Sequence, residues 1–296
     1  MRVWDWRASE AAPGGVQWRW GFTAARPQGA SAPPYESFNL GDHVGDDPAA
    51  VFANRDLLAR DLDVASDSVL YMTQVHGAAV EVAVGPRTGT PPEADAMVTA
   101  QVGLALAVLV ADCVPVLLVA PDEGLAGVAH AGRSGLAHGV VPAVVAALRD
   151  LGAGELYAVV GPSICGRCYE VPDQMRREVA AHSSVAGTVS WTGTPALDLA
   201  AGVMDQLTRE GVRVLWRPGC TRESDHLFSY RRSGRTGRFA GVVVLDRTAA
   251  EGRAGDFGHG ADGRRDGLGH DSDHEVGDAT RLRVESRMRG SPVRRR

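Results

Sequence analysis

Three stretches in the middle of the chain are apolar at nearly every position, a pattern typical of strands that are buried on both faces. They cover residues 104–110, 114–119 and 125–130 and are rich in valine, leucine and alanine. Asp112 and Pro115 interrupt the junction of the first two stretches, and a turn at 121–124 separates the second from the third. Short strands therefore fit this region better than one long helix, and we expect a sheet at the centre of the fold.

The remaining pattern up to residue 247 alternates irregularly between helical and extended periods. It predicts helices over 136–151, 172–182 and 197–207, the last opening near Asp198, and strands over 157–160, 212–216 and 239–245. A doubly wound fold would alternate regularly, so we expect an α/β (α+β) fold, a single-domain mixed-sheet α/β sandwich over residues 1–247. No dinucleotide-type glycine pattern stands at a strand-to-helix junction, so a nicotinamide cofactor is not expected.

The composition changes sharply near Arg247. The last 47 residues hold nine glycines, ten arginines, nine acidic residues and one aromatic residue, too little apolar surface to offset the entropy of ordering the backbone. We expect a disordered Gly/Arg/Asp-rich tail over 248–296. Its three histidines allow a metal-binding tail as an alternative, although their spacing fits no common ligand pattern.

Charge and composition exclude several classes of function. The formal net charge is -5, which gives no electrostatic case for binding nucleic acid or an anionic membrane. All 31 basic residues are arginine, so chemistry that needs a lysine, such as Schiff-base formation, is excluded. The apolar run 104–120 carries Asp112 and Pro115 and is shorter than a membrane span of about 20 residues. With no signal peptide recognisable at the start, a cytoplasmic location is expected.

The four cysteines are too few for a disulfide scaffold in a chain of this length. Cys165 and Cys168 form a C-x-x-C pair, which in other contexts binds zinc or cycles between thiol and disulfide. A zinc knuckle needs a second pair, which Cys113 and Cys220 do not supply, and a thioredoxin-like pair would open a helix directly. Reduced thiols are therefore the expectation, with a redox or metal role as the alternative.

Reactive side chains stand at three ends of the predicted strands. They are His76 before a glycine, Asp112 and Cys113 between two buried strands, and His130 at the end of the next strand. Rigid strand ends are common places for active sites. A cysteine in an apolar run and a single histidine also have ordinary structural roles, so the spacing alone leaves both interpretations open.

A series of ordered motifs resembles the purine nucleoside phosphorylase family formerly called polyphenol oxidase or laccase-domain proteins. The resemblance extends from about residue 16 to 245 and rests on Gly21-Phe-Thr23, Ser37-Phe-Asn39-Leu-Gly41, Val44-Gly-Asp-Asp47, Asn54-Arg55, Gln74-Val-His76-Gly77, Ala94-Asp95, Ala111-Asp-Cys113, Pro115, His130-Ala-Gly132, Gly161-Pro162 and Tyr169-Glu-Val171.

The resemblance implies a zinc site formed by His76, Cys113 and His130, with copper as another possible metal. Imidazole and thiolate suit Zn²⁺, and three protein ligands leave a fourth position open, as in catalytic sites. It also implies phosphorolysis of adenosine, inosine and methylthioadenosine, with adenosine deamination as a second activity. Purine nucleosides and phosphate are then the small-molecule partners. Asp112 is the candidate catalytic acid or an orienting residue, and Asn39 a substrate contact or a turn residue before Gly41.

The chain departs from the family pattern after the second histidine. The usual His-Ala-Gly-Trp-Arg-Gly is replaced by His130-Ala-Gly-Arg-Ser-Gly135, so the arginine comes one position early. On a strand this shift would turn Arg133 to the opposite face, whereas in a loop it could still reach the site. Without lysine, phosphate must be bound by arginines, and Arg133, Arg55 and Arg238 lie near the matched motifs.

Other functional classes remain as alternatives. A copper-dependent polyphenol oxidase-like oxidoreductase of the multicopper type needs on the order of ten histidines, and only six precede the tail. A non-catalytic zinc-binding protein and a cell-wall editing hydrolase are the other two. The sequence does not fix the oligomeric state.

Overall fold

A computed structural model describes residues 3–11 and 16–247, and these form an α/β fold built around two sheets. The five-stranded sheet has the order β1-β2-β13-β6-β3 and the six-stranded sheet the order β12-β9-β7-β8-β5-β4. The strands of the first sheet are β1 (Trp4–Ala11), β2 (Val16–Thr23), β3 (Val69–Leu70), β6 (Ala105–Val110) and β13 (Phe239–Arg247). Those of the second are β4 (Val80–Ala83), β5 (Ala96–Thr99), β7 (Val114–Ala120), β8 (Leu125–Ala131), β9 (Tyr157–Val160) and β12 (Arg213–Trp216).

Both sheets are mixed, as the irregular pattern predicts. Most neighbours are antiparallel, and three pairs, β3 with β6, β4 with β5 and β9 with β12, are parallel. The α/β class of the prediction is therefore confirmed. The proposed boundary at residue 247 stays a prediction, and the tail over 248–296 lies outside the described residues.

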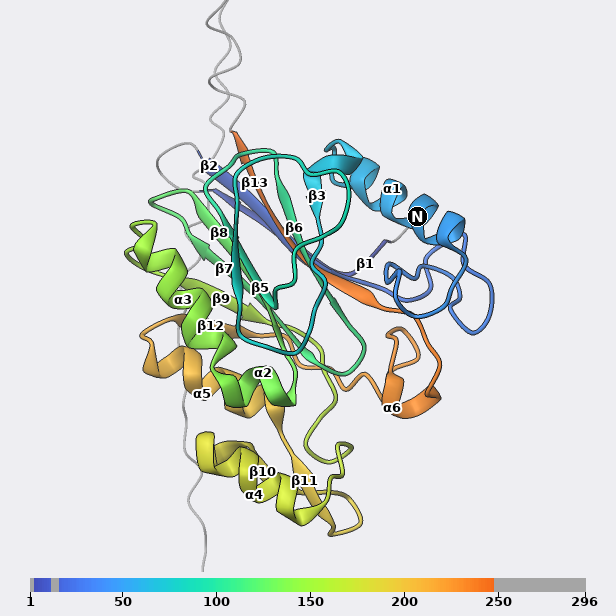
Figure 1. The fold of residues 1–296 in the computed structure, drawn as a ribbon, viewed down its shortest axis with the longest axis vertical. Coiled ribbons are helices and arrows are strands. Elements are labelled where there is room, and N and C mark those ends of the chain that lie inside the picture. Colours follow the sequence, from blue (N-terminus) through green and yellow to red (C-terminus); the bar gives the residue numbers. More distant parts are fainter. Residues whose placement is uncertain (1–2, 12–15, 248–296) are drawn as a thin grey trace, which may run out of the picture. The chain divides into compact units, whose positions relative to one another are not determined.

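Helices cover the outer faces of the two sheets, as Figure 1 shows. Helix α1 (Pro48–Asp61) lies on the five-stranded sheet, while α2 (Arg133–His138), α3 (Val140–Asp150) and α5 (Leu199–Arg209) lie on the six-stranded sheet. Helix α4 (Asp173–His182) and the hairpin of β10 (Gly187–Val189) and β11 (Pro195–Leu197) project beyond that layer, and α6 (Tyr230–Ser233) is a single turn before β13. Two 3₁₀ turns complete the elements, η1 (Ser66–Ser68) and η2 (Ser184–Ala186).

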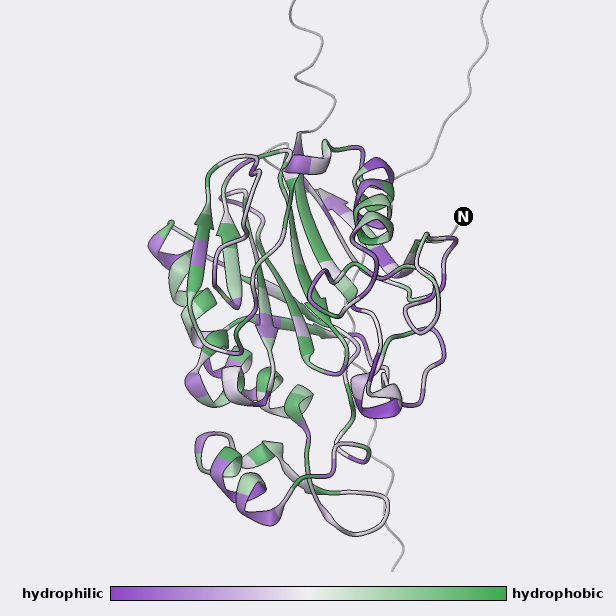
Figure 2. Ribbon diagram, turned by 45° about the vertical axis from the view of Figure 1, so that its right-hand side comes forward, coloured by the Kyte–Doolittle hydropathy of each residue, from purple (hydrophilic) through white to green (hydrophobic). Residues whose placement is uncertain are grey.

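The central strands are apolar throughout because each face packs against a different layer. In β7, Val116 and Leu118 contact the core under the helices, whereas Leu117 and Val119 contact the core between the sheets. Strand β13 divides in the same way between the inter-sheet core and the layer under α1. Figure 2 shows these strands as the most hydrophobic part of the fold. The two-sided burial explains why the sequence pattern located them correctly.

One predicted helix is interrupted. The sequence indicated a helix over 136–151, but the structure has α2 and α3 with Gly139 between them in the left-handed region (φ +82°). That conformation is easy for glycine and ends the hydrogen-bond ladder of α2. The other two predicted helices lie within two residues of their expected bounds, as α4 and α5. The Asp198 side chain accepts a hydrogen bond from the N–H of Ala201 (3.0 Å) at the start of α5. Among the described residues there is no helix with the length and apolar character needed to cross a membrane.

Candidate metal centre and active-site cavity

Two of the predicted metal ligands lie at the ends of neighbouring strands of the six-stranded sheet. Strands β7 and β8 pair antiparallel with Pro115 opposite His130. Cys113 stands in the bend that directly precedes β7, which begins at Val114. The register therefore brings the Cys113 thiol near the His130 imidazole, and their ligand atoms lie within 4.8 Å of each other.

The third predicted ligand, His76, comes from a loop that crosses the ends of these strands. Its backbone is in the left-handed region (φ +61°), which is uncommon outside glycine and concentrates at functional sites. Its Nε2 atom lies 3.9 Å from Cys113 Sγ, and its ring meets the ring of His130 edge to face with centroids 4.7 Å apart. All three ligand atoms lie within 4.8 Å of one another.

Asp95 holds both histidines in position through hydrogen bonds to its carboxylate. It is fully buried, and its carboxylate accepts hydrogen bonds from the backbone N–H groups of His76 (3.0 Å) and Gly77 (2.6 Å). The same carboxylate lies 2.8 Å from His130 Nδ1. A carboxylate on Nδ1 leaves Nε2 of His130 to bind a metal, an arrangement that orients the ring and makes it a stronger ligand.

Gly132 gives the cluster its space. A Cβ atom at this position would lie 2.8 Å from Cδ2 of His76 and 3.2 Å from Cys113 Sγ. Any larger residue would push the two ligands away from their present positions. The glycine of the His-Ala-Gly motif is therefore a requirement of the site and not of the backbone conformation.

The pKa values of the cluster favour a charged thiolate. Burial by itself would raise the pKa of the Cys113 thiol, but the neighbouring His130 and His76 outweigh it and lower this pKa to about 6. Burial would likewise lower the pKa of His130, yet the charge of Cys113 and the hydrogen bond to Asp95 raise it to about 9. For Asp95 the burial cost is overcome by His130 and by the backbone N–H groups, which hold the pKa of its carboxyl below the usual range.

These three side chains have the chemistry of a transition-metal site. Two imidazoles and a thiolate suit zinc or copper, and their shared opening leaves room for a further ligand. The structure thus brings together His76, Cys113 and His130, the group that the family resemblance named.

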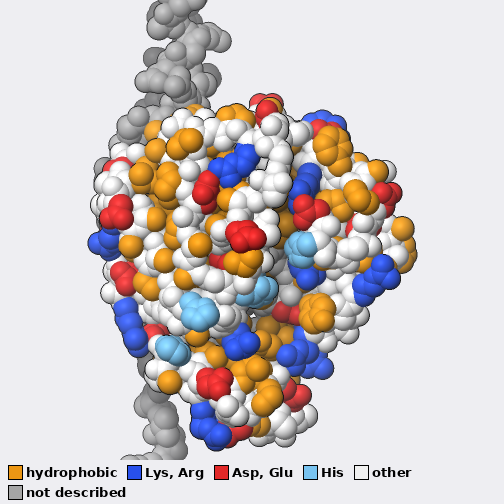
Figure 3. Space-filling view, in the orientation of Figure 1, with side chains coloured by type: hydrophobic (Ala, Val, Ile, Leu, Met, Phe, Trp, Pro, Cys, Tyr) orange, Lys and Arg blue, Asp and Glu red, His pale blue; other side chains and the backbone are white. Residues whose placement is uncertain are grey.

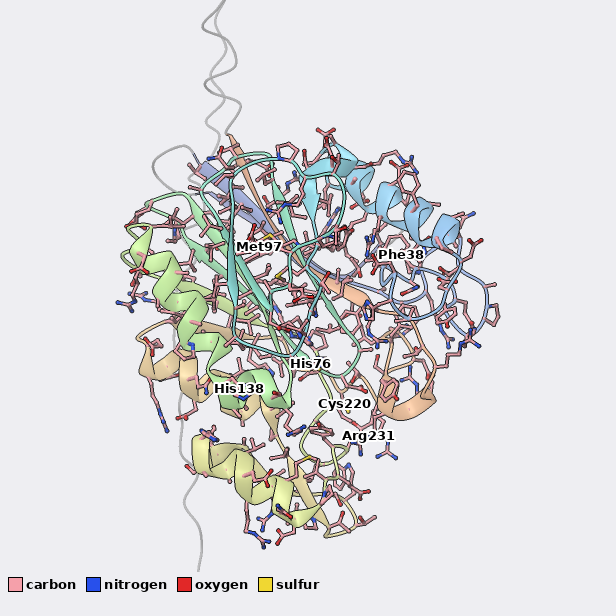
Figure 4. The ribbon with its side chains drawn as sticks, in the orientation of Figure 1. Phe38, His76, Met97, His138, Cys220 and Arg231 are labelled. Atoms are coloured by element: carbon pink, nitrogen blue, oxygen red, sulfur yellow. The ribbon has the colours of Figure 1, made fainter. Side chains whose placement is uncertain are left out.

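The cluster lies at the wall of a cavity of about 380 Å³, a size that suits a small-molecule ligand. Figure 3 shows histidine and arginine side chains around a hollow on this face of the molecule, and Figure 4 shows His76 and Arg231 on the side between α2 and α6. Its wall consists of His43, Gln74, His76, Leu109, Val110, Ala111, Asp112, Cys113, His130, Ile164, Tyr169, Leu199, Tyr230, Arg231 and Arg238.

Asp112 lines this cavity at the point where the chain passes from one sheet to the other, and its backbone is also left-handed (φ +97°). Its carboxylate accepts three hydrogen bonds, from the hydroxyls of Thr221 (2.6 Å) and Ser229 (2.7 Å) and from the N–H of Arg231 (2.6 Å). All three contacts use the carboxylate as an acceptor and hold its orientation. They are the contacts expected of an orienting residue, and the role of Asp112 in a reaction stays a prediction.

The predicted phosphate-binding arginines are not all at the cavity. Arg238 lines it, and burial lowers the pKa of this guanidinium. Arg133 begins α2, because β8 already ends at Ala131, so the expected reversal of strand face does not apply. Arg133 lies near Tyr169, a residue of the cavity wall. Burial and Cys113 raise the pKa of the Tyr169 hydroxyl, and Arg133 partly offsets this rise.

Arg55 lies at a different cavity, together with α1 and the loop after β4. Its Nη2 atom is 3.2 Å from Asp42 Oδ2, its Nε donates to the carbonyl of Leu40 (2.9 Å), and its guanidinium lies 4.0 Å above the ring of Tyr71. These contacts fix the guanidinium away from the metal cluster. The structure therefore does not bring Arg55 to the candidate site.

Asn39 is buried and its side-chain amide is saturated. Nδ2 donates to the carbonyl of Gly41 (2.9 Å) and to Asp46 (2.9 Å), while Oδ1 accepts from the N–H groups of Gly41 (2.9 Å) and Arg238 (2.8 Å). An asparagine amide has two donors and two acceptor sites. With all four used, Asn39 serves the turn before Gly41 and has no polar atom left for a substrate.

Two residues of this site were not assigned a role from the sequence. Asp95 appeared only as part of a family motif, although a single carboxylate just before the apolar run 96–99 is a signal for a buried hydrogen-bonding centre. Arg231 belongs to a Tyr-Arg-Arg segment with ordinary surface composition, and only the tertiary contact with Asp112 places it at the cavity.

Comparison with known proteins identifies the family to which this chain belongs. A family model described as multi-copper polyphenol oxidoreductase laccase matches residues 19–246. A purine nucleoside phosphorylase of Streptomyces coelicolor is 56% identical over 232 residues, which cover 77% of this chain and 93% of the relative. One of Corynebacterium glutamicum is 48% identical over 231 residues, covering 76% and 93%.

The solved structure of YlmD from Geobacillus stearothermophilus is 31% identical and superimposes with a TM-score of 0.73, covering 83% of this chain and all of that one. The region matched by the family model holds the six-stranded sheet, the five-stranded sheet except β1 and the start of β2, and all three residues of the metal cluster. The chain therefore belongs to the multi-copper polyphenol oxidoreductase laccase family, together with bacterial relatives that are named purine nucleoside phosphorylases.

Proposed function

We propose that the protein is a zinc-dependent purine nucleoside phosphorylase with adenosine deaminase side activity. Its substrates are adenosine, inosine and methylthioadenosine, which phosphate cleaves to the free base and a ribose 1-phosphate or its methylthio analogue. The observation that carries the proposal is one cavity whose wall combines the His76/Cys113/His130 group with Arg231 and Arg238. The names of the similar bacterial proteins support the same reaction class.

His76, Cys113 and His130 would hold the zinc ion. The donor set fits, because two imidazoles and a thiolate within 4.8 Å of one another match zinc chemistry and Asp95 fixes the histidine orientation. When bound, the ion supplies Lewis acidity at an open position beside the substrate. The described residues contain no array of several histidine-rich groups, so nothing in them favours a multicopper oxidase.

Arg231 and Arg238 bind phosphate in this proposal. Each is held by backbone carbonyls through one terminal nitrogen, Arg231 by Glu170 (2.8 Å) and Arg238 by Thr236 and Gly237 (3.1 and 3.0 Å). Such contacts restrain each guanidinium at the cavity wall, and the fork of donors of an arginine suits a tetrahedral oxyanion. Arg133 adds positive charge behind Tyr169.

The nucleoside occupies the apolar and aromatic part of the same cavity, between Tyr169, Tyr230 and Ile164. Phosphate then attacks the anomeric carbon as the bond to the purine nitrogen breaks, and the sugar carries positive charge in the transition state. The ionised Asp112 carboxylate stabilises that charge by its field and positions Arg231 through the backbone N–H.

The departing purine takes up a proton, and His43 is placed to donate it. This histidine lines the cavity outside the metal cluster, and its Nδ1 is 3.6 Å from Asp42 Oδ1. The neighbouring His43, together with Arg55, lowers the pKa of Asp42 to about 2. In the second reaction, water attacks C6 of adenosine and ammonia leaves, which gives inosine.

Chromatography of adenosine incubated with the full chain, with and without phosphate, tests the proposal. We expect adenine that requires phosphate, and a smaller amount of inosine that does not. Arg238→Gln should raise the KM for phosphate about tenfold or more. Arg177→Gln, on the exposed surface of α4 and outside the cavity, should leave it unchanged.

Two outcomes would overturn the assignment. Inosine as the only product would leave a deaminase without phosphorolysis. No product from a chain that carries its metal would indicate a non-catalytic zinc protein or a hydrolase of another substrate.

A further inference from the structure

A second group of metal-ligand side chains lies outside the catalytic cavity. It consists of Cys165, Cys168, Cys220 and Glu223, whose ligand atoms all lie within 4.8 Å of one another. The chain has no second cysteine pair for the C-x-x-C motif, but the structure places a different four-residue segment against it. The partner is Cys220-Thr-Arg-Glu223, which has the same spacing but ends in glutamate, so a search for cysteine pairs does not detect it.

The two motifs fold into matching turns. The N–H of Cys168 donates to the carbonyl of Cys165 (2.9 Å), and the N–H of Glu223 donates to the carbonyl of Cys220 (3.1 Å). In each turn the next residue donates to the same first carbonyl, Tyr169 to Cys165 (3.1 Å) and Ser224 to Cys220 (2.9 Å). The two loops therefore present their first and fourth side chains in the same way.

Backbone pairing brings the two turns face to face. Ser163 and Cys220 form a parallel bridge, with N–H of Ser163 donating to Gly219 (3.1 Å) and N–H of Thr221 to Ser163 (3.1 Å). The N–H of Cys165 points at the sulfur of Cys220 (3.5 Å), and the Cys168 thiol lies 3.3 Å from Glu223 Oε1.

The three cysteines of this group are partly or fully buried, unlike a cluster of surface side chains. Cys168 is only 3% exposed and Cys165 and Cys220 are half-buried, while Glu223 closes the group from the solvent side. With a bound divalent cation, three thiolates and one carboxylate would leave the group a net charge of -2. The positive charge of Arg222 lies nearby, because its Nη1 is 3.4 Å from the carbonyl of Cys168 in the opposing turn. Sulfur-rich sets of four ligands select zinc, and four protein ligands form a closed structural site.

We propose that Cys165, Cys168, Cys220 and Glu223 form a second metal site, a structural one that takes Zn²⁺. Binding releases the three thiol protons, and the four side chains complete the coordination of the ion. This site is independent of the proposed function, because none of its residues lines the catalytic cavity.

The site joins the two loops that support Asp112. Ile164, in the first loop, donates its N–H to the carbonyl of Asp112 (2.9 Å). Thr221, within the second turn, and Arg231, beyond it, donate to the Asp112 carboxylate. Figure 4 shows Cys220 and Arg231 near each other beside α6. A zinc ion here stabilises the cavity wall from outside, so its loss should loosen this wall without removing a ligand of the catalytic metal.

Metal analysis of the full chain, purified without chelator, tests the site. We expect two zinc ions per chain in the unchanged protein, one in Cys113→Ser and one in Cys220→Ser. Cobalt provides a second readout, because sulfur-to-cobalt absorption scales with the number of thiolates. Cys113→Ser should keep roughly three quarters of it and Cys220→Ser roughly one quarter, since the sites hold one and three thiolates.

Substitutions at Glu223 keep the test valid if Cys220→Ser does not fold. Glu223→Cys completes a four-cysteine set and should resist chelators longer than the unchanged chain, whereas Glu223→Gln should release its second zinc sooner. In Glu223→Gln, chelation should increase hydrogen exchange over 161–171 and 219–231 while the central strands stay protected.

Two results would overturn this second site. The first is a single zinc ion per chain that is lost in Cys113→Ser but kept in Cys220→Ser. The second is a disulfide among Cys165, Cys168 and Cys220 in the protein purified under reducing conditions, seen as a loss of two hydrogens in its mass. That result would indicate a redox pair.

Discussion

The two metal-ligand groups of this protein are built on opposite plans. His76, Cys113 and His130 are three ligands that open into a cavity, whereas Cys165, Cys168, Cys220 and Glu223 are four ligands that enclose their own space. In the first group, Cys113 and His130 stand at strand ends and His76 on a loop, and a buried carboxylate holds both histidines. The second group is attached to two turns.

The difference matters because coordination number decides what a metal can do. Three protein ligands leave a position for a reacting molecule, while four saturate the ion and leave it to hold the chain together. In our proposals the first group therefore serves the reaction and the second the stability of the fold. Each group also has a supporting residue. Asp95 orients the histidines of the first group, and Arg222 connects the two turns of the second.

The largest effect that separates the two groups is expected from paired serine substitutions. Cys113→Ser should reduce phosphorolysis by about 10³-fold or more, because it removes a ligand of the metal at the reacting centre. Cys220→Ser should lower kcat by less than about tenfold and lower Tm by several degrees. Activity and thermal unfolding of the two variants, each with its metal content, measure this contrast. Equal losses of activity would show that the groups are not functionally distinct.

A smaller loss is expected from filling the space beside the catalytic ligands. Gly132→Ala places a Cβ 2.8 Å from the His76 ring and 3.2 Å from the Cys113 sulfur. A displacement of this kind costs on the order of 10²-fold in activity, with the fold retained. Gly85→Ala is the matched control, since nothing lies within 4 Å of its Cβ. Normal turnover and zinc affinity in Gly132→Ala would contradict the tight arrangement described for the cluster.

Asp95→Asn should have an intermediate effect that is confined to the first group. The variant keeps the shape of the side chain but loses the charge that orients His130, and such changes cost about 10–100-fold in metal affinity. Competition with a chelator gives the affinity of each zinc, and the second site provides the internal reference. Loss of both ions together would mean that Asp95 supports the fold and not the catalytic group alone.

The smallest expected effect is on the thermal stability of the chain at acidic pH. The pKa of Asp95 is lowered in the folded chain, so its contribution to stability is complete above its ordinary value near 3.8 and disappears as the pH falls below it. Chelator-treated wild type should therefore lose stability through this range, and Asp95→Asn should lose less, a difference of a few degrees in Tm. Thermal unfolding from neutral to acidic pH measures it. Parallel curves for the two chains would contradict the charged contact between Asp95 and His130.

The sequence predicted the centre of the fold well and its outer parts less well. Strands β6 to β9 and β13 lie near their predicted ranges, because two-sided burial demands continuous apolar runs. Helix α1 was not assigned, since Pro48–Asp61 mixes apolar and charged residues with little amphipathic order. The helix over 136–151 was wrong in one respect, because the pattern does not register the left-handed Gly139.

The same division holds for the sites. The residue types of the catalytic group, and the family to which they belong, follow from the sequence, because ordered motifs preserve chemistry that the reaction requires. Tertiary structure alone decided three other features. Arg55 lies outside the cavity, the Asn39 amide has all its hydrogen bonds filled, and Arg231 lies at the cavity wall. Each depends on contacts between residues far apart in the chain, and a local pattern carries no information about which of several arginines a distant loop will meet.

The Cys165 motif and its partner show this most clearly. The sequence determined that two cysteines lie three positions apart, and it equally contained Cys220 and Glu223, yet nothing local connects segments 55 residues apart. The connection arises because Ser163 pairs with Cys220 at the end of the six-stranded sheet. Backbone pairing sets the distance between the two turns, and the sheet therefore decides that four separate side chains become one ligand set.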